Sequence, residues 1–123
     1  IEELALKFES KVVFLQVLEP GEIMQRLQGD AFEAGVMKEK QEEAMTYLTA
    51  WRGEFREKGV KAKSLVEVGP VVQSIINVAQ REEIDLVAMV SHGRTGLPQI
   101  FYGSVAAGVL HKIDRPLLII RAL

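Results

Sequence analysis

Apolar and polar residues follow one another along the chain in blocks that predict strands and helices in turn. Residues 11–18, with the sequence KVVFLQVL, are almost uniformly apolar, which predicts a strand covered on both faces. Residues 60–68 alternate more regularly and predict a second strand, nearer an edge of the sheet. Residues 85–91 and 116–123 are further short apolar runs, and they predict a third and a fourth strand.

Between these runs, apolar residues recur at intervals of three and four, which is the period of an amphipathic helix. The spacing predicts a long helix over about residues 32–58 ended by Gly59, a helix opened by Pro70 in its first turn, and a short helix over about residues 104–112. Residues 1–10 predict the end of a further helix. The apolar residues expected on the inner faces are Leu4, Ala5, Phe8, Met37, Ala44, Met45, Leu48, Trp51, Phe55, Val72, Ile75, Ile76, Ala79, Val105, Val109, Leu110 and Ile113.

The alternation of strands and helices predicts an α/β fold, with a parallel sheet, helices on both sides and right-handed crossovers. A length of 123 residues is suited to one folded domain and is too short for two. We therefore expect residues 1–123 to form a single domain.

Composition narrows the classes of function. The net charge is −2 and the basic residues are scattered, so nucleic acid is not an expected partner. The chain has no cysteine, which excludes disulfides, thiolate metal sites and a cysteine nucleophile, and which favours a cytoplasmic location. No apolar run approaches the roughly 18 residues that span a bilayer, so no membrane association is expected.

The segment that carries most chemical information is SHGRTGLPQIFYGSV, residues 91–105, which leaves the carboxyl end of a predicted strand and finishes at the start of a helix. Ligands of open α/β sheets bind at that end of the strands. Gly93 and Gly96 allow the backbone to approach a ligand closely. Gly103 and Ser104 offer free amides, a hydroxyl and the positive end of a helix dipole. These features predict an anion site, although the loop is neither a Walker loop nor a GxGxxG fingerprint.

This segment resembles the signature of the universal stress protein family, G-x2-G-x9-G-(S/T). Gly93, nine residues, and then Gly103 and Ser104 match its second half. The order of the elements over the whole chain is also similar. The resemblance implies a three-layer sandwich with an open, mainly parallel five-stranded sheet in the order 3-2-1-4-5. The family's central first strand has no counterpart before Ile1, and we expect further residues upstream that supply it.

The resemblance also implies a ligand and its contacts. In relatives that bind ATP, the residue types at Val17 and Met89 lie against the adenine or ribose, Gly93 approaches the ribose and phosphates, and the start of the last helix holds the phosphates. A magnesium ion could accompany the nucleotide. Val90 stands at the first glycine of the signature, which predicts weaker binding. The candidate nucleotide-contacting residues are Val17, Met89, Val90, Gly93, Arg94, Gly103, Ser104 and Val105.

We therefore expect a stress-response regulatory protein that binds ATP or a related adenine nucleotide. We do not expect an enzyme, because the sequence offers no evident base for water and no clear metal carboxylate beside the loop, so any hydrolysis would be slow. The resemblance further implies a homodimer joined through the strand Pro116 to Leu123, whose free edge must be paired or covered. The alternative is a dimeric interaction protein that does not bind nucleotide, for which Val90 is the main argument. An adenylyl-transfer or flavin-binding enzyme would need a further catalytic motif, and none is evident.

Each candidate residue also has a purely structural interpretation. The three glycines are suited to a tight loop and a helix start without any ligand. Ser104 is a residue type favoured at a helix N-cap. Arg94 and His92 are typical of exposed loop positions, and His111 is expected at the surface of the last helix.

Overall fold

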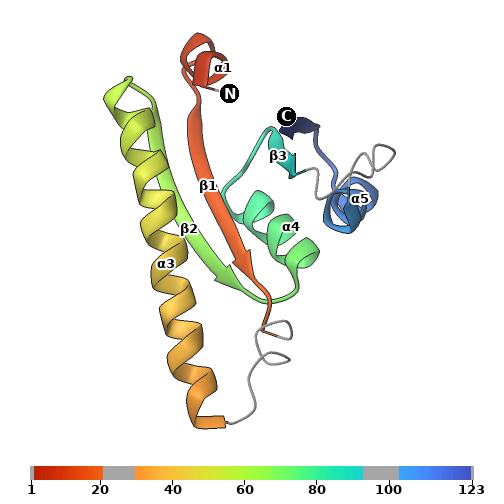
Figure 1. The fold of residues 1–123 in the computed structure, drawn as a ribbon. Helices are drawn as coiled ribbons and strands as arrows, with labels where there is room; N and C mark the ends of the chain where they lie inside the picture. The colour runs from red at the N-terminus through yellow and green to blue at the C-terminus, as the bar shows by residue number, and fades with distance from the viewer. Residues whose placement is uncertain (1, 21–29, 93–102, 123) are drawn as a thin grey trace. The chain divides into compact units, whose positions relative to one another are not determined.

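The computed structural model describes residues 2–20, 30–92 and 103–122 (Figure 1). Helices and strands alternate as the sequence predicts, which gives an α/β fold. They form two compact units, Ile1–Gly69 and Pro70–Leu123, and each is described by itself. In chain order the elements are α1 (Glu2–Lys7), β1 (Lys11–Leu18), α3 (Asp30–Glu57), β2 (Lys61–Val68), α4 (Val71–Arg81), β3 (Val87–His92), α5 (Gly103–Lys112) and β4 (Leu117–Ala122).

In the first unit, α3 packs along a pair of parallel strands (Figure 1). β1 and β2 are aligned from end to end, with Lys11 opposite Lys61 and Leu18 opposite Val68. A narrow stripe of α3 is buried, formed by Ala44, Leu48 and Phe55. These residues recur at helical spacing, so they lie on one face of α3 and hold it on the strands.

The core of this unit is centred on Phe55. Its ring meets that of Phe14 edge to face, with centroids 4.9 Å apart. Ala5, Val60 and Ala62 are buried around it, so α1, α3 and β2 all contribute to one cluster. Offset and edge-to-face ring pairs add stability beyond the area that they bury.

The end of α3 is set by Gly59, as the sequence predicts. Gly59 has a φ of +86°, in the left-handed region that glycine adopts without strain. Its amide donates to the carbonyl of Arg56 at 3.0 Å, and the amide of Val60 donates to that of Phe55 at 3.0 Å. These bonds satisfy carbonyls at the helix end and direct the chain into β2.

In the second unit, β3 and β4 form a parallel pair, with Val87 opposite Leu117 and His92 opposite Ala122. α4 packs against α5, and α5 also contacts β3. Val109 of α5 is fully buried. The other buried apolar residues on these two helices are Ile76, Val78, Ala79 and Ala106.

The two helices approach closely at Gly108, where a β-carbon would come within 2.7 Å of a methyl of Val72. Val72 is β-branched and cannot easily turn away. Gly108→Ala gains helix propensity of about 1 kcal/mol, but overpacking costs about 1–3 kcal/mol, so we expect a net loss of stability of about 1 kcal/mol in urea unfolding. Gly53→Ala in α3 is the control, because nothing lies within 4 Å of its new methyl. It should gain about 0.5–1 kcal/mol, and equal stability of the two variants would contradict this packing.

Several apolar residues that were predicted to lie on inner helix faces are exposed. Leu4 and Phe8 are 45% and 68% exposed, although Ala5 beside them is buried. Met45 and Trp51 lie at the margins of the α3 stripe and are exposed, as is Leu110 of α5. Leu4, Met45, Trp51 and Leu110 lie on helices whose contact faces are narrower than their runs of apolar residues, and Phe8 follows the end of α1.

The described strands do not establish the order of strands in a single sheet. The described strands form two separate parallel pairs, β1 with β2 and β3 with β4. Parallel pairing is as predicted, whereas the five-stranded sheet and its order stay predictions. Pro70 precedes α4 at the N-cap position, one residue earlier than the first-turn position predicted.

Candidate functional site

In the second unit, the predicted anion site lies between a strand, β3, and the helix that follows it, α5. β3 ends at His92, α5 begins at Gly103, and the two elements touch. The loop between them, with Gly93, Gly96 and Arg94, lies outside the described residues. The candidate site is therefore described through its two flanking elements.

The start of α5 has the properties of an anion-binding helix terminus. Gly103, Ser104 and Val105 are its first three residues, and its first turn carries no acidic side chain. The side chain of Ser104 lies outside the described residues, and Val105 is half-buried. The first amides of a ten-residue helix have no partner within the helix, and its dipole is positive at that end. Phosphate oxygens are chemically suited to such a terminus.

Two further candidate residues lie on β3. Met89 is half-buried and stands opposite Ile119 of β4, and Val90 stands opposite Ile120. The side chain of Val90 lies outside the described residues. Met89 and Val90 are therefore close in the chain to the carboxyl end of the strand, where the sequence predicts the ligand.

Val17 belongs to the first unit. It is the second-last residue of β1, half-buried, and stands opposite Glu67 of β2. It thus lies at the carboxyl end of its own strand pair. Because the units are described separately, the predicted convergence of Val17 with Met89 stays a prediction.

Arg115 holds the turn that leads from α4 into β3. This role was not predicted from the sequence. One of the terminal nitrogens of Arg115 donates to the carbonyls of Ala79 at 2.7 Å and Ile84 at 3.0 Å, which fixes the turn between α4 and β3. Its Nε donates to the carboxylate of Asp114 at 3.0 Å, and this hydrogen bond and charge lower the pKa of Asp114. Helical periodicity gives no signal for contacts 31 and 36 residues apart, so only the fold reveals this role.

Neither a metal site nor a membrane-spanning helix has support in the described part of the chain. Within residues 2–20, 30–92 and 103–122, no three His, Asp or Glu side chains gather where they could hold a metal ion. None of the helices described there combines the length and apolar character needed to cross a membrane.

Comparison with known proteins finds one family, with matches that cover from about two thirds of the chain to nearly all of it. Residues 1–121 match the sequence profile described as the Universal stress protein family. Universal stress protein MJ0577 of Methanocaldococcus jannaschii is 31% identical over 90% of this chain and 76% of its own length. Universal stress protein Sll1388 of Synechocystis is 32% identical over 69% of this chain, which spans about half, 55%, of that relative.

Two solved structures also match most of the chain. A structure of MJ0577 superimposes with a TM-score of 0.79 and 29% identity, and covers 98% of this chain and 88% of that one. A structure of hypothetical protein PH0823 superimposes with a TM-score of 0.74 at 22% identity, covering 93% of this chain and 78% of that one. The second likeness concerns the fold alone.

Proposed function

The chain belongs to the universal stress protein family, and on that basis we propose that it is a stress-response regulatory protein that binds ATP or a related adenine nucleotide. The observation that carries the proposal is the contact between β3 and an α5 that begins with Gly103 and Ser104 and has no acidic residue in its first turn. The phosphates would bind the first amides of α5, and Val17 and Met89 would lie against the base or ribose. Gly93 and Arg94 would complete the phosphate contacts.

The proposal includes no catalytic role. None of the candidate residues is a carboxylate that could hold magnesium or activate water, so any ATP hydrolysis would be slow. Nucleotide would act by binding one state of the protein more tightly than another, which changes the choice of partner or the dimer state. The absence of cysteine is consistent with a cytoplasmic location.

Equilibrium binding of labelled ATP tests the proposal. We expect saturable binding that unlabelled ATP displaces and GTP displaces poorly. Failure to bind ATP at millimolar concentration would favour the alternative, a dimeric interaction protein without nucleotide, which the branched side chain of Val90 at a signature glycine supports.

Val90→Gly is expected to tighten ATP binding about tenfold, because relief of crowding by a branched side chain is worth about 1–3 kcal/mol. Ala88→Gly on the same strand is the control for the cost of a glycine in β3. Titration calorimetry with the three proteins measures the effect. Equal affinity of Val90→Gly and the unmodified protein would show that Val90 does not crowd the ligand.

We also propose a homodimer through residues 116–123. Within the described residues, β4 pairs with β3, and Leu118 on β4 is 38% exposed. An apolar strand edge of this kind needs a partner or a cover, and a twofold contact is the commonest one. Sedimentation should give a dimer at micromolar concentration, and Leu118→Lys should weaken it at least tenfold. A monomer before substitution, or a dimer that survives deletion of residues 118–123, would exclude this interface.

A further inference from the structure

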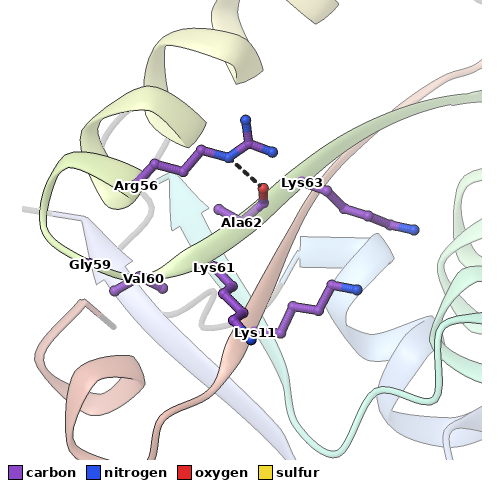
Figure 2. A pocket seen from close by; sticks show the side chains of 7 residues that line it. All are labelled: Lys11, Arg56, Gly59, Val60, Lys61, Ala62 and Lys63. Carbon is purple, nitrogen blue, oxygen red and sulfur yellow. Dashed lines mark hydrogen bonds between the residues drawn. The ribbon is translucent and has the colours of Figure 1, made fainter.

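A group of basic side chains lines a shallow cavity of about 530 Å³ in the first unit. Figure 2 shows it at the amino ends of β1 and β2, beside the end of α3. Its basic lining residues are Lys11, Arg56, Lys61 and Lys63, and Gly59, Val60 and Ala62 complete it. We call it the basic cavity.

The register of the strands creates this concentration of charge. Lys11 stands directly opposite Lys61, and both are exposed. Neighbouring strands are about 4.8 Å apart, and residues opposite each other in a pair leave the same face. Lys63, two residues after Lys61, also leaves that face. Like charges placed opposite each other destabilise a strand pair, so this arrangement is unfavourable without an anion.

The nearby groups do not neutralise the pair. Among the residues that the structure describes, no carboxylate forms an ion pair with Lys11 or Lys61. Arg56 borders the cavity from the α3 side of β2, whereas Lys61 and Lys63 leave the other face of the strand. The Nε of Arg56 donates to the carbonyl of Ala62 at 3.0 Å, which anchors the guanidinium beside β2 (Figure 2).

The basic cavity lies at the other end of β1 from Val17, which is a candidate nucleotide contact. Lys11 begins β1, whereas Val17 lies near its carboxyl end. They are six positions apart along the strand, a distance of roughly 20 Å. The paired lysines and Val17 therefore lie at opposite ends of β1.

We propose that the basic cavity binds a small phosphate-bearing anion with two or more negative charges. Lysine and arginine donate charge-assisted hydrogen bonds to phosphate oxygens, and a multivalent anion between Lys11 and Lys61 removes their repulsion. Binding therefore stabilises the β1–β2 pair. A compact ligand is favoured over nucleic acid, because the cluster is local and the net charge of the chain is −2.

Amide NMR of the full chain, titrated with inorganic pyrophosphate at constant ionic strength, tests the proposal. We expect saturable shifts at Lys11 and residues 59–63. Lys61→Ser should weaken this binding about tenfold or more, as expected for the loss of a charged hydrogen bond. Because Lys61→Ser also removes a like-charge contact, it should fold at least as well as the unmodified protein.

Lys40→Ser is the matched control, because it changes the net charge equally but lies outside the basic cavity. Lys40 is 16 residues before Arg56 on α3, roughly 24 Å along the helix. The affinity of the Lys40→Ser protein for pyrophosphate should equal that of the unmodified protein. Shifts that do not saturate, shifts confined to residues 103–105, or equal affinity of Lys61→Ser and Lys40→Ser would each overturn the proposal. None of these results depends on whether ATP binds elsewhere.

Discussion

Gly103→Asp is expected to lower the affinity for ATP at least a hundredfold. Gly103 is the first residue of α5, where the phosphates would meet the free amides. A carboxylate there competes for the same amides and repels the phosphates at close range. The loss of two or more charged hydrogen bonds, each worth about 1.5–3 kcal/mol, accounts for the size of the effect.

The same substitution should leave the fold intact. An acidic residue in the first turn of a helix is favourable to its dipole, so the stability of Gly103→Asp should change by less than about 1 kcal/mol. Gly35→Asp is the control: Gly35 is an exposed glycine of α3 with nothing within 4 Å of a new β-carbon. It should bind ATP normally. If Gly103→Asp binds ATP as tightly as Gly35→Asp does, the phosphates do not lie at the start of α5.

Phe55→Ala is expected to cost about 3–5 kcal/mol of unfolding free energy, the usual range for a buried phenylalanine. Phe55 is 6% exposed and its ring meets Phe14, so its removal leaves a cavity between α3 and the strands. A domain of ordinary stability, about 5–15 kcal/mol, would retain little margin. Urea unfolding followed by circular dichroism measures the loss.

Tyr47→Ala on the same helix is the control. Tyr47 is 60% exposed and its ring contacts that of Trp51, so its loss should cost less than about 1.5 kcal/mol. Should Phe55→Ala fail to fold, Phe55→Leu keeps most of the volume and should cost about 1–1.5 kcal/mol. A Phe55→Leu protein as stable as the unmodified one would contradict the central place of this ring.

The secondary structure was largely predictable, because it depends on local periodicity. β1 occupies the predicted residues 11–18, and α3 begins two residues before and ends one residue before the predicted limits. The exposed faces were not predictable. Leu4, Phe8 and Leu110 have the spacing of buried residues, but burial depends on what packs against each helix, and periodicity does not report that.

Only those parts of the candidate site that depend on residues close together in the sequence were predictable. The glycine and serine at the start of a helix are visible in the sequence, and α5 begins at Gly103. Arg115 and the basic cavity depend on long-range contacts and on strand register. Lys11 and Lys61 are 50 positions apart in the chain, and only parallel pairing places them side by side.

A structure of the protein grown with ATP tests the central claim most directly. The account predicts the phosphates on the amides of Gly103, Ser104 and Val105, with the base or ribose against Val17 and Met89. Nucleotide bound at any other place, or saturating ATP that leaves the start of α5 without phosphate, would contradict it.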